Sequence, residues 1–259
     1  MELVREQLGL NKPLPQQYVS YVTGLVRGDL GTSLRTKRPV LTEVQGRYMN
    51  TVQLTLLSLT WSVIAGVLIG VWSGRNRSKW QDYTGMTVAV SGISMPSFWI
   101  GFMLIMVFAV KYRLLPTTGA GSFKNLILPS ITLGVSIAAI IARFTRSSVI
   151  EVMKEDYVRT ARAKGLREKT VIWKHVFRNC MISVVTVVGL QFGFLLGGSV
   201  VTETVFAFPG LGSLLIESVN YRDYPAIQSL ILIFSLHFVL INLVVDVLYA
   251  VLNPEIQLS

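Results

Sequence analysis

Charged residues, cysteine and histidine are all scarce in this sequence. Only 15% of its 259 residues are Asp, Glu, Lys or Arg, whereas 51% are hydrophobic, and this composition is apolar for a soluble domain. Because Cys180 is the only cysteine, an intrachain disulfide is excluded. His175 and His237 form no helical HxxxH or HExxH pair, so we expect no dedicated metal site.

Signatures of nucleotide binding and hydrolysis are missing as well. The chain has no Gly-Lys dipeptide, which excludes a P-loop, and it has no GxSxG motif. A net charge of +10 can indicate nucleic-acid binding, but the sequence has no basic motif interleaved with aromatic residues, as RNA- and DNA-binding modules have. We therefore expect a non-catalytic chain with no bound cofactor and no nucleic-acid partner.

Long runs without Asp, Glu, Lys or Arg dominate what is present. A bilayer core about 30 Å thick is crossed by roughly 20 apolar residues of helix, and five runs reach or approach that length. They cover 48–74, 83–110, 125–142, 179–202 and 224–245. The chain is therefore predicted to be an all-α integral membrane protein with five transmembrane helices.

Glycine and proline shape these predicted spans. Glycines at four-residue spacing in the first span (51–73) and the fourth (180–202) leave a flat strip on which another helix can pack. They are Gly66, Gly70, Gly74, Gly189, Gly193 and Gly197. Pro96 removes a backbone hydrogen bond from the second span (83–110) and predicts a kink there. Pro129 suits the first helical turn of the third span.

Ionisable groups inside the predicted spans are rare. Asp246 is the one acid, near the predicted cytoplasmic end of the fifth span (226–252), and His237 lies deeper in the same span. Such groups are functional candidates by default. A helix-end contact for Asp246 and a hydrogen bond from His237 to a neighbouring helix are nevertheless favoured over contacts with a substrate.

Basic residues concentrate in the polar interruption at 143–179, which has ten Lys or Arg against four acids. Because positive loops mark the cytoplasmic side, this loop, the 75–82 loop and the C-terminus are expected in the cytoplasm. The N-terminal segment 1–48 and the apolar but interrupted segment 203–225 are then extracytoplasmic. The second of these is expected to be re-entrant, within a transmembrane domain that covers 49–259.

The N-terminal segment has a net charge of +3 and no signal sequence ahead of it. Positive charge opposes export, so we expect that a further span precedes Met1 and that the natural protein has six spans. The segment itself is interpreted as an amphipathic collar that rests on the lipid surface.

One basic helix is predicted inside the 143–179 loop. Met153, Tyr157 and Ala161 recur at four-residue spacing on one face. Gly165 is expected to end this helix in the left-handed conformation of a C′ residue. A helix of this kind binds either lipid headgroups or another protein.

The stretch DYVRTARAKGL at 156–166 resembles the cytoplasmic loop of membrane subunits of binding-protein-dependent ABC importers. That pattern is Glu-Ala-Ala, three residues, then Gly. Arg159, Thr160 and Ala161 occupy the triplet and Gly165 the glycine, so the Glu and the first Ala of the family are replaced.

A downstream Ile-x-Leu-Pro of the family does not match here either, and its positions fall on His175, Phe177 and Arg178. These departures are typical of the dipeptide, oligopeptide, nickel and glutathione branch, which the chain resembles as the first permease of a pair. Further resembling pieces are DLGTSLRTKRPV (29–40), SGISMPSFW (91–99), ILPSITLG (127–134), ARFTRSS (142–148), GLQFGFLLGGSVVTETVFAFPGLG (189–212), RDYPAIQ (222–228) and INLVVDVLYAVLNP (241–254).

The resemblance implies a type I importer permease in a bacterial or archaeal cytoplasmic membrane. Its expected partners are a second related permease, two cytoplasmic ATPases that use ATP and Mg²⁺, and an external solute-binding protein. The basic helix would be the coupling helix, with its tyrosine as an anchor, its alanines as points of close approach and its basic side chains as partners of acids. The residues expected to contact the ATPase are Tyr157, Arg159, Ala161, Arg162, Ala163, Lys164 and Gly165.

A second set of residues is expected to face the outer vestibule or the binding protein, with a plain structural loop as the alternative. This set is Phe208, Pro209, Gly210, Arg222 and Asp223. The expected solute is a peptide, followed by a glutathione-like peptide and then nickel. Two other classes stay open from the residues alone, an ATP-independent carrier or channel and a membrane scaffold or regulatory subunit.

Overall fold

The computed structural model describes residues 11–252, without the side chains of 182, 196, 198 and 248–252. Over this range the chain is helical, and one isolated antiparallel bridge joins Thr32 and Pro39. The helices are α2 (Leu14–Val26), α3 (Val40–Arg75), α4 (Trp80–Ser94), α5 (Ser97–Leu104), the π-helical η1 (Ile105–Lys111), α6 (Phe123–Val152), α7 (Asp156–Ala163), α8 (Glu168–Thr170), the π-helical η2 (Val171–Phe177), α9 (Arg178–Val205), α10 (Leu211–Asn220) and α11 (Tyr224–Leu252). The all-α prediction is confirmed.

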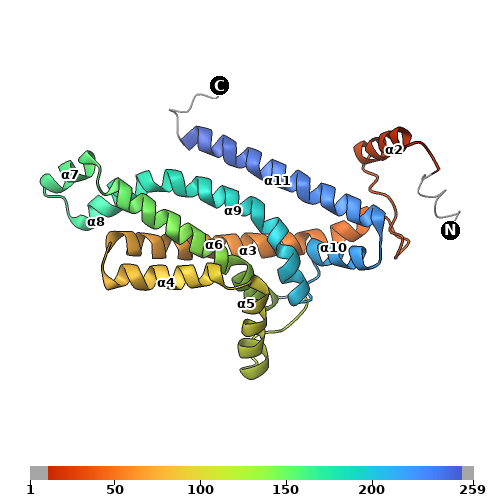
Figure 1. Ribbon diagram of the computed structural model, residues 1–259, viewed down its shortest axis with the longest axis horizontal. Helices are drawn as coiled ribbons and strands as arrows, with labels where there is room; N and C mark the ends of the chain where they lie inside the picture. The colour runs from red at the N-terminus through yellow and green to blue at the C-terminus, as the bar shows by residue number, and fades with distance from the viewer. Residues whose placement is uncertain (1–10, 253–259) are drawn as a thin grey trace.

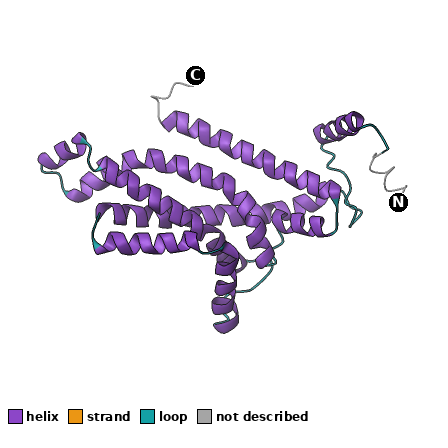
Figure 2. Cartoon of the chain, viewed as in Figure 1, coloured by secondary structure: helices purple, strands orange, loops and turns teal. Residues whose placement is uncertain are grey.

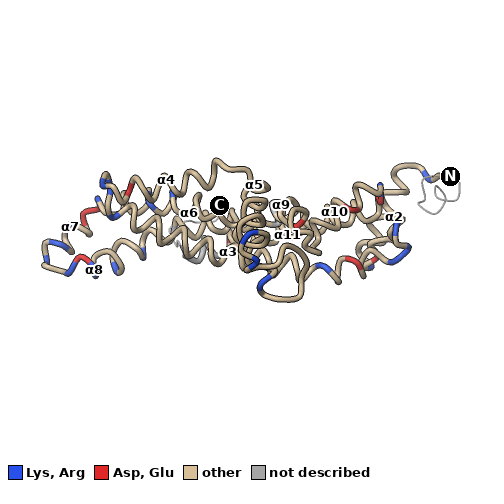
Figure 3. The backbone as a smooth tube through the Cα atoms, turned by 90° about the horizontal axis from the view of Figure 1, so that it is seen from below, with Lys and Arg blue, Asp and Glu red and all other residues tan. Residues whose placement is uncertain are grey.

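The long helices lie side by side along the longest axis of the molecule (Figure 1). α7 and α8 lie at one end of this bundle, and α10 and α2 lie at the other, so we name these the α7 end and the α10 end. α5 leaves the bundle at a large angle and projects to one side. Figure 2 shows that helices make up most of the described chain, and the two longest connections are 27–39, before α3, and 112–122, before α6. Lys, Arg, Asp and Glu gather mainly toward the two ends (Figure 3).

Within residues 11–252, three helices are long and apolar enough to cross a membrane, namely α3, α6 and α11 over Tyr224–Val247. Two bent pairs bring the number to as many as five, in agreement with the predicted count. α3 has 36 residues and is therefore about 54 Å long, well beyond the roughly 30 Å of a bilayer core. It begins at Val40, so α3 includes the end of the predicted 1–48 segment as well as the predicted first span.

Pro96 does more than kink the second span. α4 ends at Ser94, α5 begins at Ser97, and the two parts are bent by 102°. The backbone at Pro96 is extended, with ψ at 136°. This break directs α5 and η1 away from the bundle axis.

The prediction for Pro129 was wrong, because this proline lies inside α6 and not in its first turn. α6 begins at Phe123, after Ser122 in an extended conformation. Pro129 is buried, as is Leu128 beside it. Helices of membrane proteins tolerate such a proline where neighbouring groups satisfy the backbone.

Glycine allows α3 and α6 to approach closely. A Cβ atom at Gly66 would lie 2.7 Å from the Ala138 carbonyl oxygen, and one at Gly70 would lie 2.5 Å from Cβ of Thr145. Gly74 faces Val149 in the same way, at 2.9 Å. The first predicted strip therefore lies against α6.

The second strip is less uniform. Gly189 faces Val245 of α11, and a Cβ at Gly193 would lie 3.1 Å from the ring of Phe238, also on α11. Nothing lies within 4 Å of a Cβ at Gly197. Among the described residues, no other helix packs against Gly197, so the expected helix contact at this position stays a prediction.

Candidate functional site

α7 is held on one side by the apolar core of its own chain. Val158 is fully buried and Ala161 is 5% exposed. Both belong to a cluster with residues of α6, η2 and α9, namely Val149, Val171, Val176 and Cys180. Val158 and Ala161 therefore attach α7 to η2, within an apolar cluster that also includes residues of α6 and α9.

The side of α7 that packs inward centres on Val158, which the spacing argument missed. Val158 is buried together with Ala161, whereas the sequence analysis grouped Met153, Tyr157 and Ala161 on one face. Tyr157 is 42% exposed at the edge of this face, and its hydroxyl accepts a hydrogen bond from Asn179 Nδ2 at 2.9 Å. The i, i+3 spacing of Val158 and Ala161 in the sequence could have indicated that these two residues form the buried side of the helix.

Gly165 ends α7 as the sequence predicts. Its φ is +75°, in the region that favours a residue without Cβ. The Gly165 amide donates to the Arg162 carbonyl at 2.9 Å, and the Leu166 amide donates to the Ala161 carbonyl at 3.4 Å. These two bonds form a Schellman motif, which fixes the direction in which the chain leaves the helix.

The outer side of α7 is basic. Arg159, Arg162, Ala163 and Lys164 are exposed, whereas Ala161 faces inward. The Arg162 guanidinium donates to both carboxylate oxygens of Glu168, at 3.2 and 2.8 Å. Ala161 is buried against helices of its own chain. It is therefore not available for the contact with an ATPase that the sequence analysis expected.

A bidentate ion pair fastens α4 to α6 near this end. Arg146 donates through Nε and Nη2 to the two carboxylate oxygens of Asp82, at 2.6 and 2.7 Å. Ser73 Oγ and the Ser78 amide also donate to Asp82, at 2.5 and 3.0 Å. Sequence reasoning missed this pair, and the only signal was that Asp82 directly precedes the 83–110 run.

At the α10 end, Glu203 is buried within α9. Its carboxylate accepts hydrogen bonds from Thr51 Oγ1 at 2.8 Å and from the Ser213 amide at 3.0 Å. A Cβ atom at Gly210 would overlap this carboxylate. Glu203 therefore ties α3, α9 and the first turn of α10 together. The sequence analysis overlooked it because it placed the end of the fourth span one residue earlier.

Asp223 performs a similar task for the segment before α3. It accepts hydrogen bonds from Ser33 Oγ at 2.5 Å, the Leu34 amide at 3.0 Å and the Arg35 amide at 3.4 Å. Burial by itself raises the pKa of Asp223, but these hydrogen bonds outweigh burial and lower the pKa below its ordinary value. The carboxylate is charged and holds the turn in place.

Three residues of the second predicted set are thus internal. Phe208 and Asp223 are 1% exposed, and Gly210 is buried beside Glu203. The Pro209 carbonyl accepts a hydrogen bond from Asn50 Nδ2 at 2.8 Å. Arg222 alone is fully on the surface, at a φ of +55°. Phe208, Gly210 and Asp223 build the α10 end and are not surface contacts.

The ionisable groups of α11 occupy two kinds of surroundings. Tyr48 Oη and His237 Nε2 are 2.5 Å apart, and His237 Nδ1 lies 2.7 Å from the Ile233 carbonyl oxygen. The predicted hydrogen bond from His237 to a neighbouring helix is confirmed. Asp246 is exposed. Among residues 11–252, no cluster of three His, Cys, Asp or Glu side chains is arranged to hold a metal ion.

Comparison with known families decides the family of this chain. Residues 66–258 match the family described as binding-protein-dependent transport system inner membrane component. The chain belongs to this family. It is therefore a permease subunit of a binding-protein-dependent ABC importer, and such importers also contain ATPase and solute-binding subunits.

Similar proteins extend the match to nearly the full chain. It is 55% identical over 257 residues to the glutathione transport system permease protein GsiC of Pectobacterium atrosepticum, covering 99% of this chain and 84% of that protein. It is 56% identical to GsiC of Escherichia coli K12 over the same shares.

Solved structures of ABC transporters share this permease fold. A chain of the inward-facing MetNI methionine transporter matches with a TM-score of 0.70 at 18% identity, over 82% of this chain and 96% of that one. A chain of an amino acid ABC transporter with histidines matches with a TM-score of 0.64 at 17% identity, over 80% and 92%. The predicted type I importer architecture is confirmed.

Proposed function

We propose that this permease forms half of the translocation pathway for glutathione or a similar short peptide, with α7 as its coupling helix. The solute assignment rests on the GsiC relatives, whose names specify glutathione transport. The absence of a P-loop supports a non-catalytic role in which partner ATPases bind and hydrolyse ATP with Mg²⁺. A solute-binding protein delivers the solute at the opposite face of the membrane.

The observation that carries the coupling role is the two-sided character of α7. Val158 and Ala161 bury one side inside the chain, while Arg159 and Lys164 lie on the exposed side. A helix that is locked inward and basic outward transmits force from a partner with acidic groups at its rim. α7 packs on η2, which continues into α9, and it shares an apolar cluster with α6. Movement of α7 therefore tilts α6 and α9 as rigid bodies.

The second permease would cover faces that this chain leaves open. In α9, Leu190, Phe194 and Val201 are exposed on the same side as Gly197. α11 is also nearly unburied, since only 6% of its most apolar window is covered by the rest of the chain. A related permease packed on these faces would complete the pathway between the two subunits.

The α7 end lies in the cytoplasm in this proposal. Ten of the residues in 143–179 are Lys or Arg, as expected of a cytoplasmic loop. The α10 end and α2 then face the outside, where the binding protein docks.

Co-expression with the partner permease and ATPases tests the coupling role. We expect Arg159→Glu with Lys164→Glu to abolish co-purification of the ATPases and glutathione uptake, because two attractive contacts become repulsive. Lys169→Glu is the matched control, an equally exposed cation outside α7. Normal uptake by the double variant would contradict the proposal, and transport without ATPases would favour a self-sufficient carrier.

A further inference from the structure

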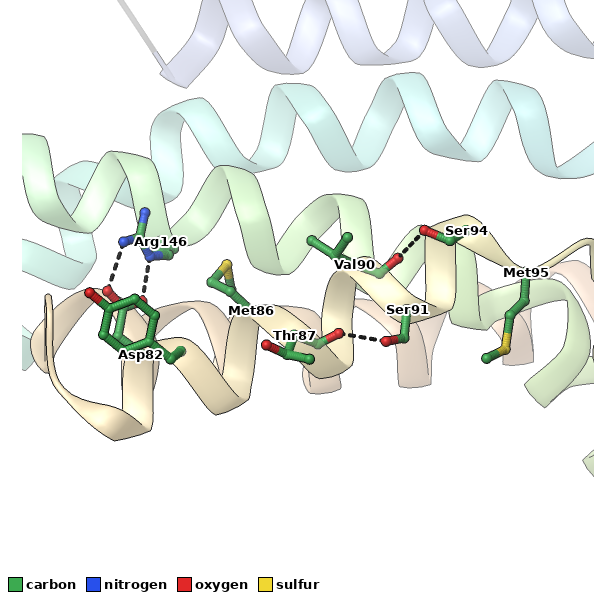
Figure 4. Close-up of a pocket in the computed structure, with 9 residues that line it drawn as sticks. Asp82, Met86, Thr87, Val90, Ser91, Ser94, Met95 and Arg146 are labelled. Atoms are coloured by element: carbon green, nitrogen blue, oxygen red, sulfur yellow. Dashed lines mark hydrogen bonds and ion pairs between the residues drawn. The ribbon is translucent and has the colours of Figure 1, made fainter.

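An open groove runs along the outer side of α4 (Figure 4). It encloses about 480 Å³, and its lining is Asp82, Tyr83, Met86, Thr87, Val90, Ser91, Ser94, Met95 and Arg146. Ser91 and Ser94 donate their hydroxyl hydrogens to the carbonyls of Thr87 and Val90 in their own helix, at 2.8 and 3.0 Å. Because these hydroxyls are satisfied, the groove beyond the ion pair offers a mainly apolar surface.

A basic cavity adjoins the groove at its charged end. It encloses about 390 Å³, shares Arg146 with the groove, and is lined by Arg77, Arg146, Ser147, Ile150, Glu151 and Lys154. Asp82 already satisfies Arg146 on the groove side. Arg77 and Lys154 are exposed and face one acid, Glu151. The cavity thus carries cations for which the part of the chain described here supplies too few anions.

Aromatic side chains mark the depth at which this cavity meets the bilayer. Trp80 is 67% exposed and Tyr83 is 66% exposed. Trp72 contacts Trp80 edge-on, with ring centroids 6.3 Å apart. Exposed Trp and Tyr are typical of the headgroup level, so this face of α4 lies against lipid.

We propose that the basic cavity and the groove together bind one anionic phospholipid, with the phosphate between Arg77 and Lys154 and one acyl chain along α4. The stretch from Asp82 to Ser94 rises about 18 Å, which matches the roughly 15 Å of hydrocarbon in one leaflet. Basic pockets between helices at the cytoplasmic side are suited to acidic headgroups. The bound lipid would join α4 to α6 beside the Asp82–Arg146 pair, next to the segment that carries α7.

Native mass spectrometry of the purified full chain in detergent micelles tests this site. We expect the wild type to retain one dioleoylphosphatidylglycerol molecule and to bind dioleoylphosphatidylcholine far more weakly. Arg77→Gln with Lys154→Gln should reduce phosphatidylglycerol retention about 30-fold, since each cation near the membrane surface contributes about 1 kcal/mol. Arg27→Gln with Lys37→Gln, at the α10 end, is the matched control and should leave retention unchanged.

A second variant separates the acyl chain from the headgroup. Val90 lines the groove and is 49% exposed. Val90→Trp fills the groove without altering charge, so retention of phosphatidylglycerol should fall while the thermal stability of the chain is preserved. Equal retention of both lipids, or unchanged retention in the double variant, would overturn the proposal. Competition by millimolar inorganic phosphate with no effect of Val90→Trp would overturn it too, because the site would then take a soluble anion.

Discussion

At the α7 end the buried carboxylate of Asp82 is paired with the guanidinium of Arg146, whereas at the α10 end Glu203 and Asp223 accept hydrogen bonds from neutral hydroxyl and amide groups. The ion pair joins α4 and α6, which pack against each other. The neutral networks join segments far apart in the chain, since Ser33 and Asp223 are 190 positions apart.

Because their buried carboxylates are held differently, the two ends of the bundle are expected to differ in rigidity. Hydrogen bonds from backbone amides to a buried carboxylate hold loops in one geometry, so the α10 end is fastened as a unit. At the α7 end, α7 is attached by a small apolar cluster and its remaining side is exposed. The α10 end is therefore suited to keep its shape, and the α7 end is suited to bind a partner.

The largest effect is expected from Glu203→Ala. This change leaves the Thr51 hydroxyl and the Ser213 amide without their acceptor and opens a cavity, so we expect a loss of about 3 kcal/mol or more in stability. Thermal unfolding of the purified chain in detergent measures it. Thr204→Ala is the control, because the Thr204 hydroxyl is exposed and bonds its own helix. An unchanged melting temperature would show that the α10 end does not depend on Glu203.

Asp82→Ala should have the next largest effect. It leaves Arg146 without a counter-charge, but the Arg146 side chain is 28% exposed, so we expect a cost of about 2 kcal/mol, below that of a fully buried pair. Asp156→Ala, which breaks the exposed pair with Arg159, should leave the melting temperature unchanged. If both substitutions lowered the melting temperature equally, the Asp82–Arg146 pair would contribute no more to stability than an exposed surface pair.

Gly165→Ala should act locally on α7. A Cβ at a φ of +75° costs about 1 kcal/mol, and it loosens the Schellman motif that ends the helix. We expect faster amide hydrogen exchange over 156–166 and reduced uptake, with no change in membrane insertion. Gly46→Ala provides the control, since nothing lies within 4 Å of its Cβ position in α3. Unaltered exchange in Gly165→Ala would show that the motif does not hold α7.

The smallest effect is expected from lowering the pH, which acts on the turn held by Asp223. Because the folded-state pKa of Asp223 is lowered, its contribution to stability is present above the ordinary carboxyl pKa and is lost as the pH falls through the folded value. The turn at 33–35 should therefore begin to loosen as the pH falls below about 4, the ordinary carboxyl pKa, and should detach only below the lowered pKa of the folded chain. Spin labels at Lys37→Cys and Asn220→Cys report their separation, which should increase on acidification. In the background of Asp223→Asn this pH dependence should be absent, and its persistence would assign the transition to another group.

Local features of this molecule were predictable in detail. Gly165 ends α7 because the left-handed backbone at that position is a property of the residue itself. Runs without charge identified the spans, since transfer of apolar helix into lipid depends on composition over about 20 residues. Packing at Gly66, Gly70 and Gly74 followed from a spacing that any helix would present on one face.

The sequence by itself thus determined an all-α membrane chain, its family and the position of the helix in its basic loop. Tertiary structure alone decided that Tyr157 lies at the edge of the buried face with its hydroxyl bonded to Asn179, and that the chain bends by 102° at Pro96. It also decided which buried carboxylate meets Arg146 and which meets Ser33. The physical reason is range: backbone conformation and apolar periodicity act within a few residues, whereas a buried charge is stable only beside a partner that folding brings from elsewhere in the chain.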